Sequence, residues 1–228
     1  CSWTAGTDAE RPAPAEYLDT TKYEVYNAGI QGSSIHLQNF LLETLLDTVK
    51  PNHVFFQLTG VRRYSYQLTD LSLRLVLEQA WYNVKSNYKA LLLEEGVKQH
   101  FHMITPGNVD SIVKNDTQEK QDANKEYIKW VHTEMFKHQY VQALTYTCNT
   151  LKNKNYSHTF IGGNHSKFNY ENEWYNKVEK TFGEKVIVPH NIIPDFEKYI
   201  VDNGMHLNPA GAEVYCKTIY EPHISTGA

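Results

Sequence analysis

The run HVFFQL, from His53 to Leu58, decides the fold class of this chain. A short, continuous apolar run is typical of a strand in a parallel sheet that is covered on both faces. Upstream, the stretch YEVYNAG, from Tyr23 to Gly29, mixes aromatic and β-branched residues and stops at glycine. This pattern predicts a second strand that ends in a turn.

Helical patterns separate these and further strands along the chain. Ser33 and Ser34 can cap a leucine-rich helix that closes at Pro51. We expect a long helix from Asp70 to about Leu91, a loop over residues 97–120, and two consecutive helices over 121–153, where the apolar stripe changes phase. Further strands are expected over 158–161 and 185–188, and a last helix near Pro209. This alternation predicts a parallel sheet flanked by helices.

Composition limits the classes of function. The 228 residues suit one α/β domain, with a helical insertion at about 70–153. A net charge of -4 argues against a nucleic-acid partner, and no apolar run is long enough for a membrane span. The three cysteines, Cys1, Cys148 and Cys216, lie in no CxxC pair, and the histidines show no metal-ligand spacing. We therefore expect no disulfide scaffold, no metal and no cofactor.

A serine and a histidine stand near opposite ends of the chain, and each lies in an expected strand-to-helix turn. Ser2 follows Cys1, and His206 precedes the last helix. In a parallel sheet such turns gather at the carboxyl edge, so the two side chains are expected to meet there. A histidine is the usual base that activates a serine nucleophile, and the backbone N–H of Gly29 is a candidate oxyanion donor.

Three blocks around these residues resemble the SGNH or GDSL-like hydrolases. The segment CSWTAG, starting at Cys1, resembles the family's nucleophile block, although cysteine replaces the acidic residue. The segment NAGIQG, starting at Asn27, resembles the second block, and DNGMHLNPAG, starting at Asp202, resembles the last. The resemblance implies a three-layer α/β/α, flavodoxin-like fold. It also implies hydrolysis of an acyl ester of a carbohydrate, lipid or small alcohol.

Two further positions depart from the family's pattern. The third block normally contains an asparagine that contacts the oxyanion, whereas the corresponding turn here contains Thr59, Arg62 and Arg63. We expect Thr59 or an arginine to act as the donor, and the arginines are candidates for binding an anionic or sugar substrate. The residue three before His206 is Asn203, an amide that cannot stabilise an imidazolium. Asp202 is therefore our choice for the orienting acid, with Asp195 in reserve.

The nucleophile of this family follows the first strand, yet one residue precedes Ser2 in this sequence. We therefore expect that the first strand lies upstream of residue 1. The sheet would then show an empty or differently filled position beside the strand at Tyr23 to Gly29. An upstream segment of ten to fifteen mostly apolar residues would restore that strand.

Two hypotheses of function follow. The first is a serine esterase that acts on a small-molecule or glycan ester through Ser2, His206 and Asp202. The alternative is a weak or inactive module that keeps the fold for binding or assembly, for instance in a viral particle or a surface complex. A third reading treats Cys1 as the lipidated first residue of a bacterial lipoprotein. The sequence leaves the compartment, the acyl group and the oligomeric state open.

Overall fold

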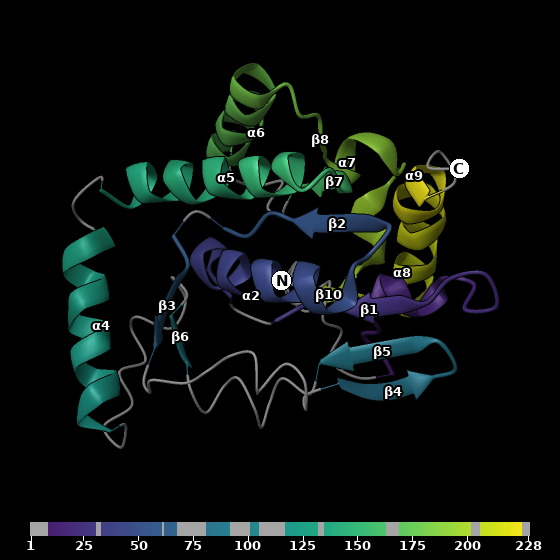
Figure 1. The fold of residues 1–228 in the computed structure, drawn as a ribbon, viewed down its shortest axis with the longest axis horizontal. Coiled ribbons are helices and arrows are strands. Elements are labelled where there is room, and N and C mark those ends of the chain that lie inside the picture. Colours follow the sequence, from purple (N-terminus) through teal and green to yellow (C-terminus); the bar gives the residue numbers. More distant parts are fainter. Residues whose placement is uncertain are drawn as a thin grey trace.

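The computed structural model describes residues 9–30, 33–60, 62–67, 81–91, 101–104, 117–131, 135–162, 169–201 and 206–224 (Figure 1). The strands are β1 (Val25–Asn27), β2 (His53–Gln57), β3 (Tyr64–Gln67), β4 (Trp81–Lys85), β5 (Tyr88–Leu91), β6 (Phe101–Ile104), β7 (Ser157–Ile161), β8 (Val186–Ile187), β9 (Ile200–Val201) and β10 (His206–Leu207). The α-helices are α2 (Ile35–Val49), α4 (Gln118–Val131), α5 (Met135–Asn153), α6 (Asn169–Phe182), α7 (Pro189–Ile192), α8 (Pro209–Tyr215) and α9 (Glu221–Ile224). Shorter turns are η1 (Pro14–Tyr17), η3 (Phe196–Tyr199) and the π-helical turn η5 (Cys216–Tyr220).

Within the described residues, the strands form two three-stranded sheets and two small pairs. In one sheet β2, β7 and β8 are all parallel, with β7 in the middle. In the other, β5 is parallel to β1 and antiparallel to β4. The pairs β3–β6 and β9–β10 are antiparallel. The chain is therefore a mixed α/β protein with parallel strands, which confirms the expected class.

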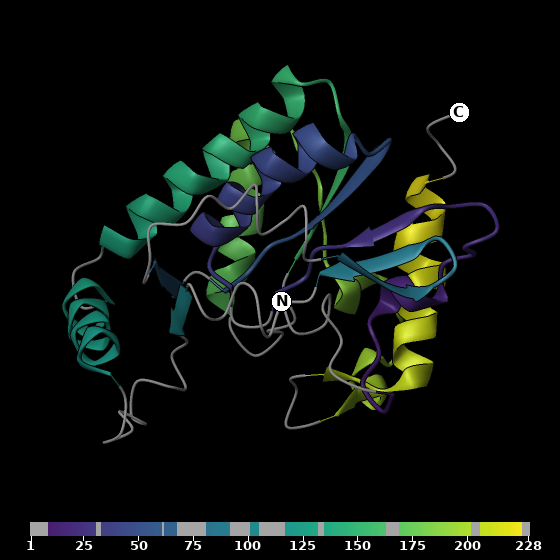
Figure 2. The same ribbon diagram turned by 60° about the horizontal axis from the view of Figure 1, so that its bottom comes forward.

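Helices cover both faces of the β2–β7–β8 sheet, as Figure 2 shows for α2 and α5 on one side and α8 on the other. Successive side chains of a strand point to opposite faces. Phe160 accordingly packs into a core with Leu46 of α2 and Leu151 of α5. Its neighbour Ile161 packs into a second core with residues of η1, α8 and η5, including Tyr215. Helical residues therefore pack against both faces of β7.

The helix after β1 forms as its sequence predicts. Ser34 is the N-cap of α2, and its hydroxyl accepts a hydrogen bond from the N–H of Leu37 at 3.3 Å. The helix ends at Val49, and its C-cap, Lys50, adopts the left-handed conformation with φ of 51°. The two helices α4 and α5, the strands β7 and β8, and the last helix from Pro209 also confirm the expectations from periodicity.

The expected helix from Asp70 to Leu91 is wrong over residues 81–91. Trp81–Lys85 and Tyr88–Leu91 form a hairpin, β4–β5, with a turn at Ser86 and Asn87. Asn87 has φ of 56°, a conformation that asparagine tolerates in tight turns. Tyr88 and Ala90 are buried while Lys89 is not, so the pattern has a period of two. The apolar residues also match a helical spacing, which misled the sequence prediction.

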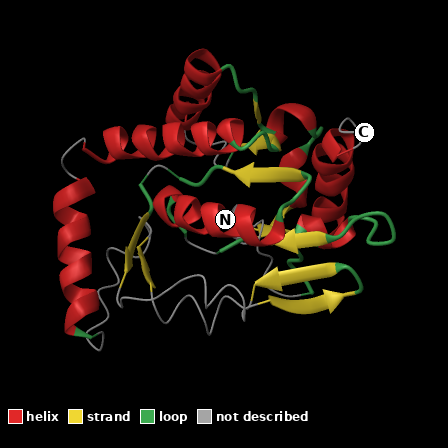
Figure 3. Cartoon of the chain, viewed as in Figure 1, coloured by secondary structure: helices red, strands yellow, loops and turns green. Residues whose placement is uncertain are grey.

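The insertion at about 70–153 is therefore not purely helical. Its hairpin adds β5 to β1, and Phe101–Ile104, which were expected to be loop, form β6. Its helical part is α4 and α5, which are shown as red ribbons in Figure 3. Residues 68–80, 92–100 and 105–116 lie outside the described ranges. Among the described residues, no helix is both long enough and apolar enough to cross a bilayer.

Candidate active site

The structure describes only part of the predicted site. Ser2, Asp202 and Asn203 lie outside the described residues, so their positions relative to His206 stay a prediction. Gly29, Thr59, Arg62, Arg63 and His206 are described. Four of these five lie in the turns after β1 and β2, and His206 lies in β10.

Gly29 lies in the turn that follows β1. Its backbone N–H donates a hydrogen bond to Oδ1 of Asn27 at 2.9 Å. The amide of Asn27 in turn donates to the hydroxyl of Tyr88 on β5 at 2.9 Å, and Asn27 is buried. The sequence identified the glycine but not this neighbour. To hold an oxyanion, the Gly29 N–H has to exchange Asn27 for the substrate.

Thr59 links the turn after β2 to the turn after β1. Its buried hydroxyl donates to the carbonyl of Ser33 at 2.8 Å and accepts from Nη1 of Arg63 at 3.0 Å. Its own carbonyl accepts from the hydroxyl of Tyr140 at 3.1 Å. These bonds bring two of the predicted turns together. They also commit the hydroxyl proton of Thr59 to Ser33.

The two arginines have different surroundings. Arg63 reaches back to Thr59, whereas the exposed Arg62 places its guanidinium 5.5 Å from the ring centre of Phe136. The carbonyl of Arg62 accepts from the hydroxyl of Tyr127 at 2.9 Å. An aromatic cluster therefore lies beside this turn, made of Tyr64, Tyr127, Trp130 and Phe136.

His206 is half-buried at the start of β10, where it pairs with Val201. The next residue but one, Asn208, caps α8 by accepting from the N–H of Gly211 at 2.8 Å. A Cβ on Gly211 would lie 2.5 Å from Cβ of Tyr199, so only glycine fits there. The glycine in the last block thus has a packing reason, and His206 is held directly before an anchored helix.

The reserve acid Asp195 lies at the surface. Its side chain is 84% exposed and lies 3.9 Å from Nζ of Lys198. Asp195 also adopts the left-handed conformation, with φ of 50°, at the start of η3. This setting gives the carboxylate no buried position from which to orient an imidazole, so Asp202 remains the better candidate.

A serine–histidine pair that the sequence did not indicate lies at the opposite, amino end of β2 and β7. Nδ1 of His53 is 2.8 Å from the hydroxyl of Ser157, and Nε2 is 3.0 Å from that of Thr159. Burial, then the nearby His158 and His223, lower the pKa of His53 to about 4. Such an imidazole is a weak base at neutral pH, and a hydroxyl replaces the carboxylate of a triad. We therefore interpret this pair as structural.

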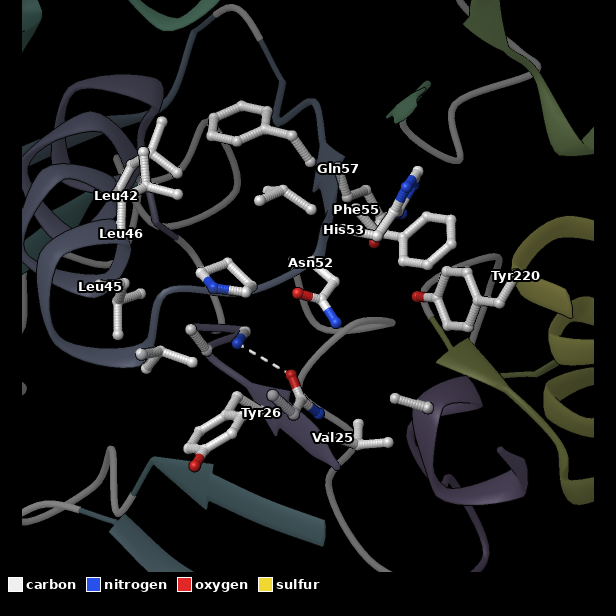
Figure 4. Close-up of a pocket in the computed structure, with 18 of the residues that line it drawn as sticks. Val25, Tyr26, Leu42, Leu45, Leu46, Asn52, His53, Phe55, Gln57 and Tyr220 are labelled. Atoms are coloured by element: carbon white, nitrogen blue, oxygen red, sulfur yellow. Dashed lines mark hydrogen bonds between the residues drawn. The ribbon is translucent and has the colours of Figure 1, made fainter. Parts of the chain in front are cut away.

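A cavity of about 620 Å³ lies between β1 and β2 (Figure 4). Leucines of α2 line it on one side, and Tyr220 lines it on another. It extends from Lys50 and His53 at the amino ends of the strands to Gly29 and Ile30 beyond the carboxyl end of β1. We call this cavity the slot. It lies beside β1, where the sequence predicted a gap in the sheet.

The described residues offer no group of three or more His, Cys, Asp and Glu side chains that could hold a metal ion. The chemistry available at the described turns is that of hydroxyls, backbone amides, arginine and histidine. Comparisons of the chain with protein-family models, with curated proteins and with solved structures found no match.

Proposed function

We propose that this protein is a serine esterase of the SGNH type that hydrolyses an acyl ester of a carbohydrate or small alcohol. The observation that carries the proposal is the hydrogen bond from Thr59 to the carbonyl of Ser33 at 2.8 Å. It joins the turns after β1 and β2, from which the site residues Gly29, Thr59 and Arg63 come. The resemblance of the blocks around Ser2 and His206 adds the nucleophile and the base.

The proposed reaction uses side chains and backbone amides alone. Ser2 Oγ attacks the ester carbonyl, and His206 accepts its proton and later delivers it to the leaving alcohol. Asp202 orients the imidazole and stabilises its cation. The N–H groups of Ser2 and Gly29 donate to the oxyanion, and Gly29 gives up its bond to Asn27 in doing so.

One observation favours the alternative, a binding or assembly module. The Gly29 N–H donates to Oδ1 of Asn27, a group of the protein itself. A preorganised oxyanion site keeps its donors aimed at the position where charge develops. If this bond persists when an ester is offered, the turn after β1 serves as a rigid frame and not as a catalytic device.

Hydrolysis of p-nitrophenyl acetate by the wild-type chain tests the proposal. We expect Ser2→Ala and His206→Gln each to lower kcat/KM by at least ~10³-fold, because members of such a triad act as a unit. Ser157→Ala is the matched control, since it removes a serine that also contacts a histidine. His138→Gln on the exposed face of α5 is the control for His206. Both controls should retain wild-type turnover.

A fluorophosphonate probe gives a second readout. We expect its mass on the peptide that contains Ser2, and no adduct in His206→Gln. Labelling of Ser157, or loss of hydrolysis in Ser157→Ala with full turnover in Ser2→Ala, would assign the activity to the pair at the amino end and contradict the proposal. A wild-type protein with neither turnover nor adduct would favour the module.

A further inference from the structure

The slot has the size and the lining of a small-molecule site. Its volume of about 620 Å³ lies within the range of ligand pockets, which are lined mainly by apolar side chains with a few polar groups. Leu42, Leu45 and Leu46 of α2 line one side, and Figure 4 shows Tyr220 on the opposite side. A ligand in the slot therefore lies between two apolar walls.

The slot follows the direction of the strands. It begins at Lys50 and His53, beside the amino end of β2, and reaches Ile30 beyond the carboxyl end of β1. β2 alone contains five residues, or ~17 Å of strand. Because the apolar walls continue along this length, an unbranched alkyl chain fits the slot better than a compact ring does.

Several apolar side chains of the slot keep part of their surface exposed. Leu45 of α2, and Val54 and Phe55 of β2, are only partly buried, although each belongs to a helix or strand of the core. An alkyl chain that fills the slot removes this surface from water. Burial of apolar surface is the main driving force for binding such a chain.

The amino end of the slot provides a positive charge. Three charged side chains line the slot, Lys22, Glu24 and Lys50. Lys22 pairs with an aspartate at 3.3 Å and Glu24 with a lysine at 3.0 Å. Lys50 is exposed, and among the described residues no acidic side chain forms an ion pair with it. An anionic head group at this end complements the charge of Lys50.

The carboxyl end of the slot limits the length of the chain. Ser33 lines this end and is 1% exposed, and its Oγ has no hydrogen-bond partner among the described residues. A methyl group placed against this hydroxyl cannot bond to it, so contact there does not favour binding. The gain from a longer chain should therefore stop where the chain reaches Ser33.

We propose that the slot binds one linear fatty acid. Its carboxylate lies at Lys50, and its alkyl chain runs between the leucines of α2 and Tyr220 towards Ser33. The ligand is a free single-chain carboxylate, and its binding goes beyond the proposed esterase and does not depend on it.

A series of chain lengths tests the site in the full chain. Octanoate, decanoate, dodecanoate and hexadecanoate are titrated below their micelle concentrations, and binding is followed by isothermal titration calorimetry. We expect one molecule per chain and a Kd that falls by ~10-fold for each two methylene groups up to dodecanoate. Hexadecanoate should gain less per methylene. A Kd that does not depend on chain length, or binding of many molecules per chain, would overturn the proposal.

Substitutions on α2 check that the chain lies in the slot. Leu45→Arg places a charge on the slot side of the helix, whereas Thr48→Arg makes the same change on its exposed side. Leu45→Arg should abolish binding of dodecanoate, and Thr48→Arg should preserve it. Leu45→Phe keeps the side chain apolar but narrows the slot, so it should weaken dodecanoate more than octanoate. Equal affinities in Leu45→Arg and Thr48→Arg, or in Leu45→Phe and the wild type, would contradict the site.

The head group is tested with a neutral probe of the same length. Lys50→Gln should weaken binding of dodecanoate by ~2–5-fold, the size expected for an exposed ion pair, and should leave the Kd of dodecanol unchanged. Lys129→Gln on α4 is the control, since this lysine is exposed and does not line the slot. Equal effects of Lys50→Gln on both probes, or no effect on either, would contradict the position of the carboxylate.

A photoreactive dodecanoate provides a readout that needs no variant. A diazirine at the end of the alkyl chain should label peptides from residues 25–30 or 35–57, because β1, α2 and β2 surround the slot. An excess of unlabelled dodecanoate should remove the adduct. Labels confined to other peptides would overturn the proposal, whether or not the protein hydrolyses esters.

Discussion

The two edges of β2 differ in what they contact. Along one edge, β2 pairs with β7 over five residues, from His53 opposite Ser157 to Gln57 opposite Ile161. Along the other lies the slot. The same apolar run is therefore closed on one side and open on the other. The comparison teaches that an apolar pattern specifies a strand, whereas its burial depends on which segments of chain arrive beside it.

The difference extends to the helices. Leu151 of α5 is completely buried beside β7, in a core that also contains Phe160 and Val178. Leu45 of α2 is half-buried and lines the slot. Removing methyl groups from a packed site leaves a cavity, but removing them beside an existing cavity loses fewer contacts. Replacing each leucine by alanine therefore compares the packing beside β7 with the packing beside the slot.

The largest effect is expected from Leu151→Ala. It should lower the free energy of unfolding by ~3–5 kcal/mol, because the side chain is enclosed on all sides. Leu45→Ala should lower it by about 1 kcal/mol, since the side chain is only partly buried and lines the slot. Urea unfolding followed by circular dichroism measures both. Equal losses in the two variants would mean that the slot is filled in solution.

Local signals explain which elements sequence analysis found. The leucine stripe and Ser34 predicted α2, and the run from His53 predicted β2, because both signals lie within a few consecutive residues. The hairpin β4–β5 was missed, although Asn87 provides its turn. Its place is decided by parallel pairing of β5 with β1, more than sixty residues away along the chain. No local pattern contains that contact.

The candidate site likewise combines residues that local sequence signals identify with contacts that they do not. Gly29 and Thr59 could be found as turn residues after predicted strands. Their hydrogen bonds to Asn27 and Ser33 could not, because the direction of a backbone N–H or a hydroxyl depends on tertiary packing. The pair of His53 and Ser157 was missed for a related reason, since its members are brought together only by the register of β2 and β7.

A moderate effect of pH on stability is expected from His53, which lines the slot at the amino end of β2. The pKa of His53 is lowered to about 4 by burial, then by His158 and His223, so the folded state disfavours its protonation. The unfolded chain takes up this proton below about 6.5, the ordinary pKa of histidine. The stability contributed by neutral His53 is therefore fully present above pH 6.5 and is lost as the pH falls towards 4.

The size of this effect follows from the shift and the exposure. A full shift of this size corresponds to ~3 kcal/mol, and solvent screening of the half-buried ring reduces it to about 1 kcal/mol. Urea unfolding at pH 7 and pH 4.5 should show that His53→Gln loses less stability on acidification than the wild type. Because both proteins share the same carboxylates, the difference isolates His53. An identical loss in both would contradict the lowered pKa.

The smallest effect is expected on the other wall of the slot. Nζ of Lys89 on β5 lies 3.0 Å from Oε1 of Glu24, next to β1, and also donates to the hydroxyl of Tyr26 at 3.1 Å. The hydrogen bonds from Tyr26 and Lys89 lower the pKa of Glu24. All of these charges are accessible to solvent, where ion pairs contribute little. Glu24→Gln should therefore change Tm by less than ~2 °C, measured by differential scanning calorimetry.

Glu24→Gln separates two contributions to the position of β1. It removes the ion pair of Glu24 with Lys89 but keeps the backbone pairing of β1 with β5. If β1 is held mainly by its parallel pairing with β5, hydrogen exchange at Val25, whose N–H donates to the carbonyl of Asn87 at 2.7 Å, stays slow in Glu24→Gln. If Val25 exchanges faster, the ion pair and not the ladder fixes β1. The position of β1 would then depend on the side chains of Glu24, Tyr26 and Lys89, and the exchange of Val25 would be salt-sensitive.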